Sequence, residues 1–165
     1  MDRKVVFLGA RRWSNWLCGR AVELAQMKIL APVKGKYQIT SPYGWRKHPI
    51  TGKRRLHAGV DLVTGRAKTA VIAPEDGLVI EARKSTAPGG GYGYFVKYRG
   101  ISGATHRMAH LEQDSIAVKA GDRVKQGQKL GIMGTTGAST GIHLHWEVRG
   151  KVPVDPIAWM NKQNA

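Results

Sequence analysis

Residues 141–147 read GIHLHWE, and this stretch decides how the rest of the chain is interpreted. Apolar residues alternate here with His143 and His145, which predicts a buried strand. Side chains alternate between the faces of a strand, so both imidazoles should point the same way. The two histidines are then either core residues hydrogen-bonded to backbone or part of a metal site.

Three residues upstream favour the metal site. His57 and Asp61 lie four apart, on one face of an extended segment, and His110 follows a short apolar run. Zinc binds histidine nitrogen and carboxylate oxygen, and a catalytic zinc keeps one position for water beside three protein ligands. His57, Asp61 and either His143 or His145 would supply those ligands. The remaining histidine of that pair and His110 would then act as general base and stabilise an oxyanion.

A structural zinc site is disfavoured, because such sites usually have four ligands, often cysteines, and this chain has only Cys18. His106 lies four residues before His110 and would share its face on an extended strand. We expect His106 to contact loop residues rather than to line the cleft.

The glycine content and the rhythm of short apolar runs predict a mainly β fold. The chain has 165 residues, 21 of them glycine, and is long enough for one domain with a core of its own. Short strand-like runs separated by turn signals favour a compact antiparallel sheet with long loops. Residues 45–56 are predicted to be a basic loop.

Helices are expected only towards the two ends of the chain. Apolar residues recur with helical spacing within residues 11–30, and a short closing helix is expected over residues 155–160. We therefore divide the chain into a basic helical segment at 1–36, a domain at 37–160 that carries the metal site, and a tail at 161–165.

The net charge of +16 is concentrated in the first third of the chain. Residues 1–56 hold 13 Lys and Arg against 2 acidic residues, which gives +11, and residues 57–165 hold 14 against 9, which gives +5. This charge either keeps the protein soluble or attracts a polyanion such as nucleic acid, anionic lipid or an acidic cell envelope. No stretch approaches the ~18 apolar residues of a membrane span, and the apolar run at 5–8 is too short for a secretory signal.

Several pieces of the sequence together resemble the lysostaphin-type zinc murein endopeptidases. The resemblance runs from about residue 39 to 148, with a weaker tail to 159. In order, the pieces are SPYGWRKHP, HAGVD, VIAPEDGLVI, GGGYGYFVKY, MAHL and VKAGDRVKQGQKLGIMGTTGASTGIHLHWEV. This family commonly has Tyr where Met108 stands, and often Thr where His106 stands, and both positions concern the cleft wall.

The resemblance implies that His57, Asp61 and His145 bind Zn²⁺ and that His110 and His143 are the catalytic histidines. It implies a groove between loops, in which peptide bonds of bacterial peptidoglycan are hydrolysed. These bonds lie between D-alanine and meso-diaminopimelate or within glycine bridges. Either catalytic histidine takes a proton from the attacking water, and the other steadies the oxyanion.

The cellular setting that fits best is a phage lysin or virion-associated hydrolase acting on the cell wall, and the alternative is a bacterial envelope endopeptidase. The basic N-terminal half would contact the anionic envelope, and no specific nucleic acid partner is expected. A nucleic-acid binder would explain the charge but not the placed histidines. A biotinyl-type or lipoyl-type carrier domain also leaves them unexplained, and a related zinc carboxypeptidase would need a Glu-x-x-His motif that this chain lacks.

Overall fold

The computed structural model describes residues 28–47, 52–84 and 91–165. The predicted N-terminal helix lies outside these ranges except for residues 28–30, which are not helical. No helix in the described part of the chain is long and apolar enough to cross a membrane.

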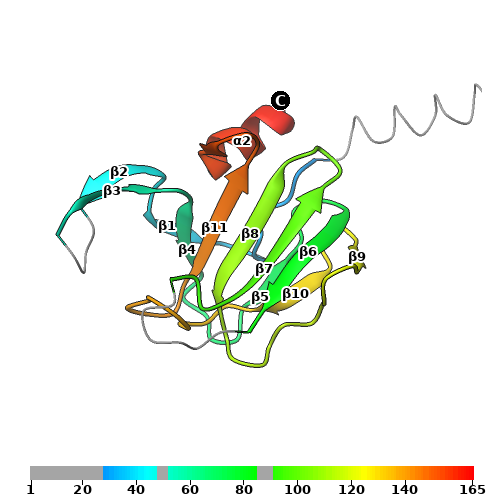
Figure 1. Cartoon of the computed structure of the whole chain (residues 1–165), viewed down its shortest axis with the longest axis horizontal. Helices are drawn as coiled ribbons and strands as arrows, with labels where there is room; N and C mark the ends of the chain where they lie inside the picture. Colours follow the sequence, from blue (N-terminus) through cyan, green and yellow to red (C-terminus); the bar gives the residue numbers. More distant parts are fainter. Residues whose placement is uncertain (1–27, 48–51, 85–90) are drawn as a thin grey trace, which may run out of the picture.

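One antiparallel sheet forms the body of the protein (Figure 1). Across it lie, in order, β1 (Gln38–Ser41), β4 (Val60–Val63), β11 (Leu144–Arg149), β8 (Thr105–Leu111), β7 (Tyr94–Gly100), β6 (Gly77–Arg83) and β9 (Arg123–Val124), while β12 (Pro153–Val154) pairs with β11. Two antiparallel strand pairs stand apart, β5 (Ala70–Ile72) with β10 (Lys129–Ile132) and β2 (Gly44–Lys47) with β3 (Arg54–His57). The prediction of a mainly β, antiparallel fold is confirmed.

The pleat of β11 separates the core from the functional face of the sheet. Leu144, Trp146 and Val148 are fully buried in the main apolar cluster. Because strand side chains alternate, His145 and Glu147 project from the opposite face. The alternation read from residues 141–147 therefore describes β11 correctly from Leu144 onward.

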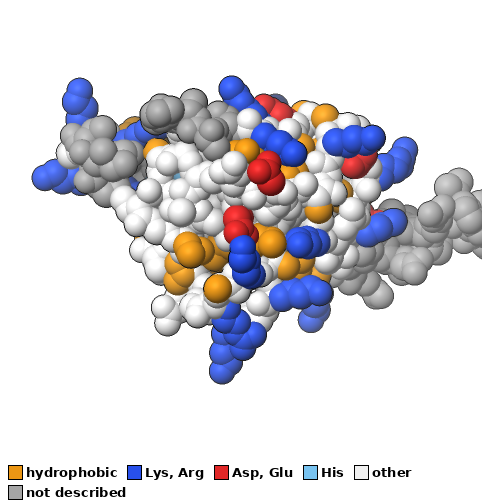
Figure 2. All heavy atoms as spheres, turned by 90° about the horizontal axis from the view of Figure 1, so that it is seen from below, with side chains coloured by type: hydrophobic (Ala, Val, Ile, Leu, Met, Phe, Trp, Pro, Cys, Tyr) orange, Lys and Arg blue, Asp and Glu red, His pale blue; other side chains and the backbone are white. Residues whose placement is uncertain are grey.

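Residues 45–56 are not a loop throughout, as predicted from their turn residues. Their described parts form the ribbon β2–β3, called here the arm, in which Gly44 pairs with His57 and Lys47 with Arg54. The arm projects away from the sheet (Figure 1), and Lys and Arg side chains stand out at that end of the molecule (Figure 2). The many charged residues of this exposed ribbon conceal the alternation by which half-buried strands are usually found.

His106 lies in the core and not in the cleft. Its Nε2 is 2.8 Å from Oε1 of Glu75, in the turn before β6, and its Nδ1 accepts a hydrogen bond from the Trp146 indole at 3.3 Å. The ring stacks on Tyr98, with centroids 4.8 Å apart. Glu75 is also buried, and Ser102 donates to it through both its N–H and its hydroxyl.

Glu75 is expected to make the fold sensitive to acid. Burial acts to raise its pKa, but the hydrogen bonds from His106 and Ser102 outweigh this and lower the pKa below the ordinary value of 4.5. A lowered carboxyl pKa contributes stability above the unfolded-state pKa, and this contribution is lost as the pH falls through the folded-state pKa. Glu75→Leu should therefore lower the free energy of unfolding by about 1–3 kcal/mol at pH 7, because buried donors lose their acceptor.

Thermal melts at pH 7 and below pH 4.5 test this. The Glu75→Leu penalty should shrink at the lower pH. Leu111→Ala removes a fully buried apolar side chain instead and serves as the control, since its penalty should not depend on pH in this way. A Glu75→Leu penalty that is independent of pH would contradict the prediction.

Helix α2 (Pro156–Gln163) closes the chain over β11. The carboxylate of Asp155 caps it by accepting from Ile157 N–H at 2.9 Å, and Pro156 suits the first turn because its missing N–H has no partner there. The helix extends three residues past its predicted end at residue 160. Asn164 exchanges two hydrogen bonds with the backbone of Ile29, which ties that part of the N-terminal region to the sheet domain.

Candidate metal centre and groove

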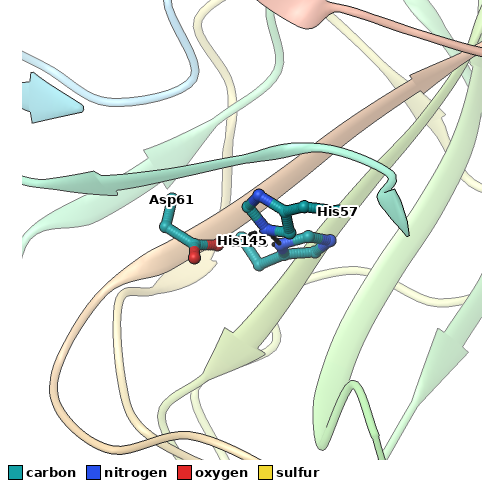
Figure 3. A group of neighbouring side chains, drawn as sticks. All are labelled: His57, Asp61 and His145. Atoms are coloured by element: carbon teal, nitrogen blue, oxygen red, sulfur yellow. Dashed lines mark hydrogen bonds and ion pairs between the residues drawn. The ribbon is translucent and has the colours of Figure 1, made fainter. Parts of the chain in front are cut away.

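Three side chains from three strands converge at one point on the functional face of the sheet (Figure 3). His57 ends β3, Asp61 lies in β4, and His145 lies in β11 directly opposite Asp61. His57 Nε2 is 3.2 Å from Asp61 Oδ1 and 3.1 Å from His145 Nδ1, and His145 Nδ1 is 2.8 Å from the same Oδ1. The fold thus brings together the three ligands that the family resemblance implies, with His145 as the member of the histidine pair.

In His57 and His145, the ring nitrogen that points away from Asp61, called here the outer nitrogen, is already hydrogen-bonded to an acceptor. His57 Nδ1 is 2.8 Å from the carbonyl of Pro42, and His145 Nε2 is 3.2 Å from Oε1 of Glu147. These contacts assign the ring protons to the outer nitrogens and leave the inner lone pairs facing the carboxylate of Asp61. Such outer contacts are typical of histidines that bind metals.

Three electron-pair donors at this spacing fit a zinc ion. A tetrahedral zinc with bonds of about 2.0–2.1 Å holds its ligand atoms about 3.3 Å apart, close to the 2.8–3.2 Å found here. The pKa of His145 is raised although burial acts to lower it, because Asp61 and Glu147 favour positive charge at this place. The alternative of a core histidine bonded to backbone does not describe His145, since both of its ring nitrogens face carboxylate side chains, Asp61 and Glu147.

Charge around the centre is held by two ionised carboxylates. Burial acts to raise the pKa of each, but the close approach of the His145 and His57 imidazoles holds the pKa of Asp61 far below its usual range. Hydrogen bonds from His145 and Tyr92 likewise outweigh burial and hold the pKa of Glu147 at about 2. Both groups therefore stay negative at neutral pH, as a cation site requires.

Glu147 is the centre of a network that the sequence analysis did not assign. Its Oε1 accepts from the Tyr92 hydroxyl at 2.6 Å, and its Oε2 accepts from Arg107 at 2.9 Å and from Arg149 at 3.0 Å. The Arg107 guanidinium also lies over the Tyr92 ring, 4.1 Å from its centroid. The alternation that pairs His143 with His145 extends to Glu147 and could have identified it, whereas Tyr92 and Arg107 come from other strands and loops and carry no local signal.

Glu147→Gln is expected to weaken zinc binding by about 10–100-fold, the usual cost of losing a supporting contact behind a metal ligand. The amide presents a donor where Arg107 or His145 also donates, so the His145 ring loses its fixed orientation. Competition with a chromophoric zinc chelator measures the affinity. Glu81→Gln, on β6 away from the site, is the matched control, and equal affinities of the two variants would contradict the role of Glu147.

His110 reaches the site because β8 carries a bulge. The register between β7 and β8 shifts between the pairs Val96–Met108 and Tyr94–Leu111, and His110 has a positive φ of 59°. A bulge re-aims the side chains that follow it, so His110 lies beside His143 and His145 while His106 stays in the core. The expectation that His106 and His110 share a face was wrong for this reason.

A loop contact orients the His110 ring. Nδ1 of His110 is 2.7 Å from the Thr136 carbonyl, so it donates there and leaves Nε2 with a lone pair. The Thr136 loop packs closely on the backbone of Gly93, which has a φ of 60°, and any side chain at Gly93 would overlap the Thr136 backbone. Burial, followed by the neighbouring His143, lowers the pKa of His110 to about 4, so the ring is neutral at neutral pH.

His143 stands at the mouth of the site, just before β11 begins. Its backbone bridges to Gly134, and its Nδ1 is 2.8 Å from the Gly141 carbonyl. Its Nε2 lies 3.8 Å from Asp61 Oδ1, and its ring centroid lies 4.7 Å from that of His110. The His110 and His143 rings thus lie beside the three converging donors without belonging to them.

One groove is lined by all five side chains described above, His57, Asp61, His110, His143 and His145. The groove has a volume of about 480 Å³ and runs between the arm, the loop at 138–142 and residues Gly91 and Tyr92. Arg46 and Arg55 of the arm line it as well. The groove therefore brings two positively charged side chains beside the three converging donors.

The chain belongs to peptidase family M23, whose family model matches residues 55–156. A curated relative, the peptidoglycan DD-endopeptidase ShyB of Vibrio cholerae, is 40% identical over 119 residues, which cover 71% of this chain and 26% of the relative. This chain spans only about a quarter of the length of the curated relatives it matches.

Solved structures agree with the family assignment. A zinc-containing peptidase from Vibrio cholerae is similar with a TM-score of 0.68 and 39% identity, over 79% of this chain and 39% of that one. The catalytic domain of the antimicrobial peptidase lysostaphin from Staphylococcus simulans gives a TM-score of 0.63 and 29% identity, over 76% and 92%. The lysostaphin-type fold inferred from the sequence is thereby confirmed.

Proposed function

We propose that this protein is a zinc-dependent endopeptidase that hydrolyses peptide bonds of bacterial peptidoglycan, in cross-links or stem peptides. The observation that carries the proposal is the convergence of two histidine lone pairs and one ionised carboxylate beside two further histidines in an open groove. Family M23 membership and the peptidoglycan DD-endopeptidase relative support the same reaction.

In this proposal, His57, Asp61 and His145 hold the metal, and His110 and His143 act on the substrate. When bound, Zn²⁺ lowers the pKa of water and polarises the scissile carbonyl. His110 is neutral and presents the Nε2 lone pair, which suits it to accept a proton and later deliver it to the leaving amine. His143 is then placed to steady the carbonyl oxygen as an imidazolium, because its Nδ1–H donates to the Gly141 carbonyl and only a proton on Nε2 can donate to that oxygen.

Mass spectrometry of released muropeptides tests the proposal. Zinc-loaded protein is incubated with purified peptidoglycan that has direct D-alanine–diaminopimelate cross-links, and in parallel with peptidoglycan that has glycine bridges. New fragments from at least one substrate, abolished by 1,10-phenanthroline, are the expected result. If neither substrate yields new peptide termini, the proposed activity is wrong.

We further propose that residues 1–36 form a basic segment that contacts the anionic envelope and that 37–160 is the endopeptidase domain. Of the expected tail at 161–165, residues 161–163 belong to helix α2 of that domain. The charge of +11 on residues 1–56 supports envelope contact. Surface charges are screened beyond about 8 Å at 0.15 M salt, so binding to whole peptidoglycan should weaken steeply as salt rises. Cleavage of a short soluble peptide should respond much less.

Removing residues 1–27 should lower activity on whole cell walls more than activity on the soluble peptide. The deletion stops before Ile29 because that residue is buried and bonded to Asn164. Both activities are measured across a salt series for the full chain and the shortened one. An equal loss on both substrates would show that the segment belongs to the fold and not to envelope binding.

We also propose a phage lysin or virion-associated hydrolase as the setting, with a bacterial cell-envelope endopeptidase as the alternative. The strong positive charge suits an enzyme that must reach the wall by its own affinity. Antibody detection in purified virions or phage lysates would support the first setting. Detection in the envelope of uninfected cells would support the second.

A further inference from the structure

The arm carries two arginines on the same face as a metal ligand. Arg46 pairs directly with Arg55 across β2 and β3, and Gly44 pairs with His57 two residues further along. Because alternate residues of a strand share a face, Arg46 and Arg55 project on the side of the ribbon that carries His57. Trp45 and Arg54 lie on the other side, with the Arg54 guanidinium 5.6 Å from the Trp45 ring centroid.

The two arginines have little negative charge near them to offset their mutual repulsion. Like charges directly opposite each other on paired strands are destabilising. Arg46 has one acidic neighbour, Asp61 Oδ2 at 3.7 Å, and the other oxygen of that carboxylate faces the metal ligands. In the part of the chain that the structure describes, Arg55 makes no ion pair.

Both arginines line the groove beside the metal centre. Arg46 is partly buried there, with 35% of its side chain exposed, and Arg55 is exposed. A guanidinium binds a carboxylate through two parallel hydrogen bonds, so this pair can hold one carboxylate in a fixed orientation. A carboxylate there would also relieve the repulsion between the two arginines.

From this geometry we propose that Arg46 and Arg55 form a binding site for the substrate carboxylate that lies next to the scissile bond. The proposal rests on the proposed function. When the bond between D-alanine and the D-centre of diaminopimelate is cleaved, the carbon that bears the leaving nitrogen also bears a free carboxylate. A bond inside a glycine bridge has no such group. The arginine pair therefore selects direct cross-links with a free carboxylate on the leaving side.

The experiment compares two soluble cross-linked peptide dimers that differ only in that carboxylate, which is free in one and amidated in the other. Zinc-loaded full-length protein should cleave the free form with a kcat/KM at least about 10-fold higher, as expected for losing a charged hydrogen bond. Arg46→Gln and Arg55→Gln should each lower kcat/KM on the free form by about 10–100-fold while changing the amidated form by less than about twofold. Zinc content is measured for each variant, because Arg46 lies near Asp61.

Arg54→Gln is the matched control, since it removes the same charge from the other face of the same strand. It should leave the ratio of the two substrates unchanged. Equal cleavage of both dimers by the unaltered protein, or the same loss of discrimination in Arg54→Gln, would overturn the carboxylate site while leaving the endopeptidase activity established. Cleavage of neither dimer would overturn both proposals.

Discussion

Asp61→Asn and His145→Ala are each expected to leave the protein without bound zinc and without measurable hydrolysis. Each variant removes one of the three donors that converge in the described part of the chain, at the point where β4 and β11 face each other. The affinity loss should therefore exceed the ~10–100-fold that losing a supporting residue costs. Elemental analysis of the purified protein should find one zinc per chain before substitution and almost none afterwards.

Asp114→Asn provides the matched control for the aspartate variant. Asp114 is exposed and has a φ of 57°, a conformation that asparagine tolerates, so neither fold nor zinc content should change. Circular dichroism of all variants separates metal loss from unfolding. Full zinc content in both Asp61→Asn and His145→Ala would refute the ligand assignment.

Replacing either of the two histidines that we propose to be catalytic should give the opposite combination, in which zinc is retained and activity is lost. His110→Ala and His143→Ala are each expected to lower kcat by about 10²–10⁴-fold, the range over which a positioned acid or base contributes. Neither side chain belongs to the three converging donors, so zinc content should stay near one per chain.

The double variant adds a sharper test of this pair. Two histidines that act on the same transition state should not have additive effects, so the double variant should be little worse than the more damaging single one. The ring centroids lie 4.7 Å apart, which is close enough for such coupling. A single variant with near-normal activity and full zinc content would remove that histidine from the mechanism.

The sequence predicted those parts of the site that follow a regular period. Alternation in residues 141–147 predicted that His145 points away from the side of the buried Trp146. His57 and Asp61 do come together, but from two strands, β3 and β4, and not from one extended segment as expected. The choice of His145 over His143 came from the family resemblance, because both lie on one face of the predicted strand. In the structure the strand proper begins at Leu144, and His143 instead bridges to Gly134.

Features that depend on irregular backbone or on distant partners could not be predicted in this way. One extra residue in β8 turns His110 into the groove and leaves His106 in the core, and nothing in the local composition marks that residue. The network of Glu147 with Tyr92 and Arg107 joins three separate segments. The arm could not be predicted, because an exposed, charged ribbon lacks the apolar periodicity of a half-buried strand.

One face of strand β11 lies in the core and the other carries His145. The number of residues in this strand is therefore constrained as strictly as their identity. Inserting a single residue between Leu144 and His145 would exchange the faces of every position beyond it, turning the His145 imidazole inward and the Trp146 indole outward. One such change would disrupt the candidate metal centre and the hydrophobic core at the same time. Neither feature can therefore tolerate a single-residue change in the length of this strand. Length variation among functional relatives should accordingly be confined to segments such as the exposed turn at 150–152, which lies outside both the strand and the groove.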